Sequence, residues 1–233
     1  MSSTRSPRIA NRLLAALPKK DYQALQRHGE EVPLIFEEIL YQPNELISDV
    51  YFPNSGIISL LAAVNGRATL EVGLIGQEGM LGLAIFMGVS SSQNRAVVQG
   101  TGLAMKIKAS AFRKECNNGG ALPLLLRRYT HSLVTQITQS AICNQFHSVD
   151  ARLARWLLMT HDRMGNDEFQ LTQEFLSNML GVRREGVSRA AGDLQKRKLI
   201  TYSRGHLTVL DRAGLEAISC GCYEIIKQES NSS

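Results

Sequence analysis

Hydrophobic and polar residues alternate along the chain with two different periods, and each change of period predicts a change of structure. Residues 11–27 have apolar positions at helical spacing, which predicts a short amphipathic helix. From residue 31 to about residue 108, short apolar runs are separated by turn residues, a pattern typical of antiparallel strands in a barrel or roll. Asn65-Gly66, between two of these runs, is the strongest hairpin signal.

Residues 122–146 have the longest helical pattern in the chain. Apolar residues recur there at steps of three and four: Leu122, Leu125, Leu126, Tyr129, Leu133, Ile137, Ala141 and Ile142. A helix of about 25 residues is about 37 Å long, which is more than a small domain needs. We therefore expect part of this stripe to pack on a second copy of the chain, the alternative being a core helix within one chain.

The remaining pattern is helical and more polar. A helix is expected around residues 148–164, with Leu153, Trp156, Leu157 and Met159 on its buried face. After a loop at "GNDE", a further helical segment covers residues 211–227, and the tail "QESNSS" is expected to be disordered.

Composition narrows the class of protein. The chain has 233 residues, of which 44% are hydrophobic and 20% charged, as in ordinary globular proteins. It contains no apolar run of the roughly 20 residues that span a bilayer and no secretion signal, so we expect a cytoplasmic protein without a membrane partner. The net charge is +5, and six basic residues against two acidic ones lie between Arg183 and Lys198. Such a run is often only a solvated helix face, but it also suits a polyanionic partner.

The four cysteines are Cys116, Cys143, Cys220 and Cys222. They form no Cys-x-x-Cys pair and suggest no disulfide framework. Cys220 and Cys222 are spaced too tightly for an ordinary zinc pair, so the sequence predicts no metal site. It leaves open whether these two thiols are redox-active.

Residues 171–200 have the pattern of two helices joined by a tight turn. Thr172 is a good N-cap and Gly181 a natural C-terminal glycine for the first helix. Ser177 is small where two crossing helices come closest. The buried positions are expected at Leu176, Leu180, Val182, Val187, Ala190 and Leu194, with Ala191 beside them. This is the helix-turn-helix pattern.

The second helix of the pair starts badly for an isolated helix. Arg183 stands where a capping Ser, Thr or Asp is usual, and Arg183 and Arg184 face the positive end of the helix dipole. Arg184, Glu185, Ser188 and Arg189 are expected on the face opposite the buried one, in the half of a recognition helix that meets base edges. A Glu185–Arg189 surface ion pair is the alternative, but it leaves Arg183 and Arg184 unexplained.

Two strand-like runs follow, "LITY" and "HLTVL", on either side of Ser203-Arg204-Gly205. They predict a small hairpin, or wing, whose basic tip at Arg204 is placed for a phosphate group. A wing after a recognition helix favours DNA binding.

The stretch "LTQEFLSNMLGVRREGVSRAAGDLQKRKLI" resembles the winged helix-turn-helix of the Crp/Fnr superfamily of bacterial transcription regulators. The resemblance includes Arg184-Glu185 followed by Arg189, and it implies that these three residues read bases, in half-sites of the TGTGA type. It also implies phosphate contacts by Arg183, Ser188, Arg204 and Thr172, a homodimer on two-fold half-sites of double-stranded DNA, and RNA polymerase as a partner.

The expected fold is therefore α+β. Residues 1–118 would form a cyclic-nucleotide-binding-like antiparallel β-roll that acts as a sensor, residues 119–147 a dimerisation helix, and residues 148–227 the winged helix-turn-helix domain.

The sensor region lacks the features that would identify its ligand. Relatives that bind cyclic AMP hold the ribose with a Glu where Met80 stands, and Arg95 with Ala96 is at best a remnant of their phosphate site, so we expect no cyclic AMP binding. The absence of Cys before Cys116 excludes the N-terminal iron–sulfur cluster of oxygen-sensing relatives. Haem bound through His28 or His131 stays open, without supporting context.

The sequence thus predicts a homodimeric, effector-responsive transcription regulator with no catalytic residues. An enzyme is disfavoured because no catalytic triad, zinc spacing or nucleotide loop is present. The alternative is a sensor or scaffold whose winged domain mainly contacts proteins. Effector and target promoters are undetermined, as is the choice between activation and repression.

Overall fold

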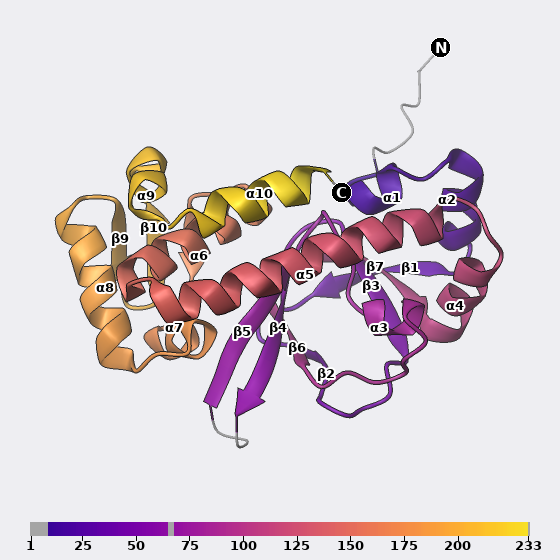
Figure 1. Ribbon diagram of the computed structural model, residues 1–233, viewed down its shortest axis with the longest axis horizontal. Helices are drawn as coiled ribbons and strands as arrows, with labels where there is room; N and C mark the ends of the chain where they lie inside the picture. Colours follow the sequence, from indigo (N-terminus) through magenta and orange to yellow (C-terminus); the bar gives the residue numbers. More distant parts are fainter. Residues whose placement is uncertain (1–8, 65–67, 233) are drawn as a thin grey trace, which may run out of the picture.

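The computed structural model describes residues 9–64 and 68–232 (Figure 1). The N-terminal part contains two short helices, two antiparallel sheets and two further helices. Their bounds are α1 Arg12–Ala15, α2 Lys19–Gln26, β1 Gly29–Leu34, β2 Ile39–Tyr41, β3 Asp49–Pro53, β4 Ile57–Val64, β5 Ala68–Ile75, α3 Leu83–Phe86, β6 Arg95–Gly100, β7 Gly102–Lys108 and α4 Ala109–Asn117. The sheets have the strand orders β1-β7-β3 and β2-β6-β4-β5, with antiparallel pairing throughout, so the predicted β-roll is confirmed.

The C-terminal part is mainly helical and contains one small sheet. Its elements are α5 Leu122–Phe146, α6 Val149–Met164, β8 Glu168–Gln170, α7 Gln173–Leu180, α8 Arg184–Lys196, β9 Ile200–Ser203, β10 His206–Val209, α9 Arg212–Ile218 and α10 Cys222–Ser232. Helix α5 runs along the long axis of the molecule, from the roll to the winged part, with α10 beside it (Figure 1). The α+β fold class is confirmed. No helix among the described residues is long and apolar enough to cross a membrane.

Several details differ from the sequence prediction. The helix expected over residues 11–27 is two helices, because Pro18 lacks a backbone N–H and disfavours helical geometry at the residue before it. The helix expected over residues 211–227 is also divided, since Ser219 is extended between α9 and α10. The tail expected to be disordered continues α10 to Ser232, and the Arg12 side chain donates hydrogen bonds to Asn231 and to the Ser230 carbonyl.

The hairpin predicted at Asn65-Gly66 has its two strands: β4 and β5 pair antiparallel from Ile58↔Ile75 to Val64↔Ala68. The turn itself lies outside the described residues.

Helix α5 has the predicted bounds, but its stripe packs mostly within the chain. Leu122, Leu126, Tyr129 and Leu133 are buried in the core of the roll. Only Ala141 and Ile142 of the predicted stripe are exposed. Two hydrogen bonds of a polar side chain hold α5 against β5 in this orientation. The Gln136 side chain accepts from the Leu74 N–H at 2.5 Å and donates to the Leu74 carbonyl at 3.1 Å.

Buried polar groups also join the roll to α6. The Glu71 carboxylate of β5 lies 2.9 Å from Trp156 Nε1 and 2.8 Å from Ser59 Oγ, and Ser59 Oγ is also 2.6 Å from Gln99 Oε1. The Ser59 hydroxyl has one hydrogen and two acceptors beside it. A protonated Glu71 that donates to Ser59 satisfies all three groups. Consistently, loss of solvent raises the pKa of Glu71 to about 7, although Ser59, Arg155 and Trp156 each act to lower it.

This raised pKa predicts a pH-dependent stability. Between the unfolded pKa near 4.5 and the folded pKa near 7, the unfolded chain loses the proton first. The free energy of unfolding should therefore fall as pH rises through this window, by at most about 1.4 kcal/mol per pH unit, and level off above it. Urea unfolding of the wild type and Glu71→Gln, measured from pH 4.5 to 8, tests this. We expect the wild-type-minus-variant difference to carry the slope; a pH-independent difference would contradict it.

Candidate nucleic-acid interface

Helix α7 is held at both ends in the predicted way. Thr172 Oγ1 accepts a hydrogen bond from the Phe175 N–H at 3.0 Å, so Thr172 is the N-cap. Gly181 ends the helix in the left-handed region, at φ 61°, and its N–H bonds to the Ser177 carbonyl. The buried Arg152 of α6 donates a hydrogen bond to the Leu180 carbonyl and thereby also holds the C-terminal end of α7.

Helix α8 begins at Arg184, with Arg183 at the N-cap and no side chain bonded to its first N–H groups. Arg183, Arg184 and Glu185 are exposed, so the start of α8 has the positive potential that attracts an anion. The prediction of an uncapped, cationic helix start is confirmed.

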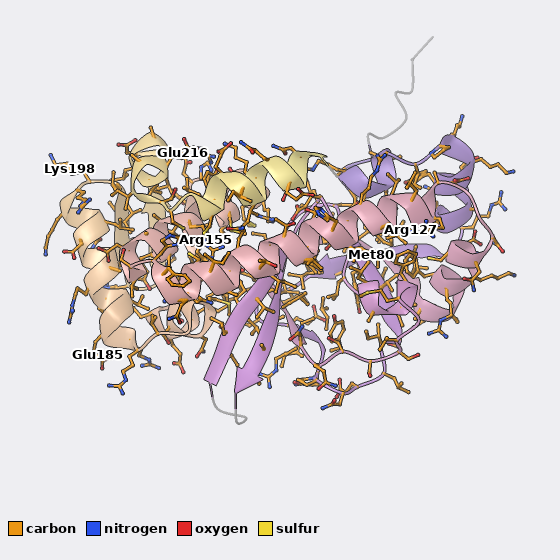
Figure 2. The ribbon with its side chains drawn as sticks, viewed as in Figure 1. Met80, Arg127, Arg155, Glu185, Lys198 and Glu216 are labelled. Atoms are coloured by element: carbon orange, nitrogen blue, oxygen red, sulfur yellow. The ribbon has the colours of Figure 1, made fainter. Side chains whose placement is uncertain are left out.

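The two faces of α8 divide as expected. Val187, Ala190, Ala191 and Leu194 are buried against α6 and α7. Arg184, Glu185, Ser188 and Arg189 are all exposed. Glu185 and Lys198 lie toward opposite ends of α8, at the outer end of the molecule (Figure 2). The face that carries the predicted base readers therefore borders solvent along its length.

The wing forms with the predicted strands. β9 and β10 pair from Ile200↔Val209 to Ser203↔His206, and Arg204 and Gly205 make the two-residue turn at φ 50° and 83°. Positive φ at both turn residues is the type that matches the twist of a hairpin. A third strand, β8, pairs with β10 and was not predicted, because only Phe169 of its three residues is buried.

The structure brings three of the predicted residues to one hollow. Thr172, Arg184 and Arg204 line it, from the start of α7, the start of α8 and the tip of the wing. Glu174 lies there too and forms an ion pair with Arg184. Sequence reasoning missed Glu174 as a partner. Of the ion pairs between described residues, none joins Glu185 to Arg189, so the alternative pair expected from the sequence does not form.

The two glycines of α8 have no packing role within the chain. A Cβ on Gly192 would have no atom within 4 Å, and one on Gly186 would make only ordinary contact with Val182 at 3.8 Å. Their small size is therefore not required by the fold of the isolated chain.

In the roll, protein side chains occupy the predicted ligand region. Met80 is fully buried, and the Tyr129 hydroxyl of α5 donates to the Met80 carbonyl at 3.0 Å. A Cβ at Gly79 would lie 2.3 Å from the Tyr129 ring, so glycine is needed there for close approach. Arg95 Nε donates to Gln42 Oε1 at 2.9 Å, which engages the predicted phosphate remnant.

Other candidate ligands of the sequence lie apart from this region. His131 pairs with Glu229 at 2.8 Å and His28 with Glu115 at 3.5 Å, both on the surface. Cys143, Cys220 and Cys222, which linear spacing did not connect, are buried together with His147 beside them. Because the four come from separate segments, only the fold could reveal them as a group.

Known proteins resemble the chain in both sequence and structure. Residues 151–218 match the family model described as Crp-like helix-turn-helix domain. No curated protein sequence matches the chain.

Three solved structures are similar to the chain over most of its length. FixK2 from Bradyrhizobium japonicum has a TM-score of 0.70 at 16% identity, over 83% of this chain and 98% of that one. CLP, a c-di-GMP-responsive global regulator of Xanthomonas campestris, has a TM-score of 0.67 at 14% identity, over 82% and 99%. A transcriptional regulator of the CRP family from Thermus thermophilus has a TM-score of 0.66 at 16% identity, over 81% and 96%.

The resemblance seen in the sequence is thus confirmed in two independent ways. At these identities the structures establish the fold, and the family model establishes the kind of helix-turn-helix. Residues 151–218 match the Crp-like helix-turn-helix domain, and the chain as a whole has the same fold as FixK2 and the CRP-family regulator of Thermus thermophilus.

Proposed function

We propose that the chain is a sequence-specific, homodimeric DNA-binding transcription regulator of the cytoplasm, without enzymatic activity. The observation that carries this proposal is the exposed face of α8, with an uncapped start and four polar or charged residues. The proposed units are the roll at residues 1–118, the dimerisation helix at residues 119–147 and the winged domain at residues 148–227. RNA polymerase is the expected protein partner.

In this proposal α8 lies in the major groove. Arg184 and Arg189 bind guanine edges, and Glu185 accepts from a cytosine amino group. Arg183, Ser188, Arg204 and Thr172 hold phosphates. In the chain without DNA, Arg184 forms an ion pair with Glu174. DNA binding would exchange this ion pair for a base contact, and the free-energy cost is small because the pair is exposed. The bare surfaces at Gly186 and Gly192 leave room for the close approach of a groove wall.

The base and phosphate roles predict different losses. Arg189→Ala should cost about 1–3 kcal/mol on the selected site and relax preference at one base pair. Arg183→Ala should weaken selected and random DNA alike and reduce the slope of log affinity against log salt by about one. Fluorescence anisotropy on a site obtained by selection from random DNA, at several salt concentrations, measures both.

Arg27→Ala is the matched control, because Arg27 is exposed at the end of α2, at the opposite end of the molecule from α8 (Figure 1). It should leave affinity and specificity unchanged. Equal binding of selected and random DNA by the wild type would refute the proposal and favour the alternative, a scaffold whose winged domain contacts proteins. Selected half-sites unrelated to TGTGA would refute only the assigned base readers.

The proposed dimer rests on the outer face of α5. Leu124 and Ile142 are 52% and 39% exposed, and they lie about five helical turns apart on the same side. Their large apolar side chains favour burial against a second copy.

Leu124→Glu/Ile142→Glu should therefore lower the dimer fraction in analytical ultracentrifugation. Leu46→Glu, at a residue of the roll that is 78% exposed, should leave it unchanged. If the wild type sediments as a monomer at the concentration where it binds its site, the proposal of a homodimer fails.

We also propose that the roll answers to an effector other than cyclic AMP. The buried Met80 supplies no acceptor for a ribose hydroxyl, and Arg95 is engaged by Gln42. Calorimetry with cyclic AMP should give no saturable binding at micromolar concentrations. Met80→Ala, which makes space without adding an acceptor, should behave in the same way. Micromolar binding by the wild type would overturn this part, and binding by Met80→Ala alone would show that bulk, not the missing acceptor, excludes the nucleotide.

A further inference from the structure

Three cysteines and a histidine meet where the long helix ends. Cys143 lies in the last turn of α5, and His147, four residues later, is its C-cap. Cys220 and Cys222 lie before and at the start of α10. The four ligand atoms, one from each side chain, all lie within 4.8 Å of one another. All three cysteines are buried and His147 is half-buried, so the group is largely shielded from water.

The distances suit one tetrahedral metal ion. With metal–sulfur bonds of about 2.3 Å and metal–nitrogen bonds of about 2.0 Å, tetrahedral ligands are separated by about 3.8 Å for two sulfurs and about 3.5 Å for sulfur and nitrogen. Cys143 Sγ lies 3.4 Å from Cys220 Sγ, and Cys222 Sγ lies 3.7 Å from His147 Nδ1. The other pairs of ligand atoms lie within 4.8 Å, so shifts of up to about 1 Å would complete the geometry.

The tight spacing of Cys220 and Cys222 along the chain predicted no metal site. In the structure these two are not a chelating pair within one helix. Cys220 belongs to the connection after α9, and Cys222 begins α10. Gly221 between them is unobstructed, since a Cβ added there would have no atom within 4 Å. Cys143 and His147, four residues apart, supply the other two ligands from a second segment, at a spacing that places side chains on one side of a helix.

The buried guanidinium of Arg155, which lies beside the thiol cluster, independently indicates negative charge at the cluster. Three thiolates, a neutral imidazole and a divalent ion have a net charge of −1. Arg155 of α6 interacts electrostatically with all three cysteines. Its side chain is buried, its Nε has no hydrogen-bond partner, and its Nη1 has only Ser140 Oγ at 3.5 Å and Met159 Sδ at 3.3 Å. Figure 2 shows Arg155 beside the C-terminal half of α5. An anionic metal–thiolate centre would balance this charge, for which Glu71, with its raised pKa, is a further acidic neighbour.

We propose that Cys143, His147, Cys220 and Cys222 bind one zinc-type divalent ion in a closed, four-coordinate structural site. Binding releases the three thiol protons and uses the neutral imidazole, with no change of oxidation state. All four positions are filled by protein, so the site has no open position for catalysis. The ion joins the end of α5, where the chain turns into α6, to the start of α10.

Metal analysis of the full chain, purified with reductant and without oxygen, tests the proposal. We expect inductively coupled plasma mass spectrometry to find one equivalent of zinc per chain. After chelation, one equivalent of Co²⁺ should give the visible bands of a tetrahedral ion and a near-ultraviolet thiolate charge-transfer band. Zinc should also raise the midpoint of thermal unfolding of the chelated wild type, a readout that needs no variant.

Cysteine and histidine variants identify the ligands. Cys143→Ser, Cys220→Ser, Cys222→Ser and His147→Ala should each weaken Co²⁺ binding by about 100-fold or more, since loss of outer-shell partners alone costs about 10–100-fold. Cys116→Ser is the matched control, because Cys116 is on α4 and outside the cluster. It should bind Co²⁺ like the wild type. Failure to bind stoichiometric zinc or Co²⁺, an octahedral cobalt spectrum, or full binding by the ligand variants would overturn the proposal. A Cys143–Cys220 disulfide found under these reducing conditions in place of metal uptake would overturn it in favour of a redox pair.

Discussion

Buried polar contacts join β5 to α5 and α6, and these helices position the proposed DNA-binding elements relative to the roll. Gln136 bonds to both backbone groups of Leu74, and Glu71 bonds to Trp156. A buried polar group that loses its partner costs about 1–3 kcal/mol, so these contacts select one arrangement of the helices on the sheet where apolar packing would tolerate several. Because α6 also supplies Arg152 to the end of α7, the same contacts set the direction in which α8 leaves the molecule.

The sequence predicted the parts of this structure that depend on local rules. The caps at Thr172 and Gly181, the two faces of α8 and the wing around Arg204 follow from hydrogen bonding, periodicity and turn geometry within a few residues. It was incomplete where the outcome depends on distant contacts. Part of the apolar stripe of α5 was expected to pack on a second copy of the chain, but Leu126 and Leu133 are buried in the core of the roll, and the outward residues include Leu124, which the stripe left out. The sequence also did not predict β8 or the end of α10, because these elements depend on distant partners. β8 pairs with β10, and α10 packs against α5.

The start of α8 is a case in which a locally unfavourable choice has an explanation only at the level of function. Arg183 gives the helix no capping oxygen, and Arg184 places positive charge at its positive end. The pairing of Arg184 with Glu174 offsets part of that charge in the free chain, but both side chains are more than half exposed, so the pair contributes little. Sequences usually violate local rules where a ligand compensates for them, and in the proposed complex the phosphate-lined groove of DNA would do so at the start of α8.

The thiol cluster lies at the point where the two halves of the molecule could move relative to each other. The chain passes from α5 to α6 through His147 and Ser148, so a small change of backbone angles there would swing α6, and with it α7 and α8, about the end of the long helix. Of the ligands of the proposed metal site, Cys143 precedes this turn, His147 lies in it, and Cys220 and Cys222 come from the connection between α9 and α10 and from the start of α10. A bound ion would thus cross-link both sides of the turn. The proposed effector of the roll would then have to act on α8 mainly through the polar contacts of β5, because the metal would hold the other connection rigid.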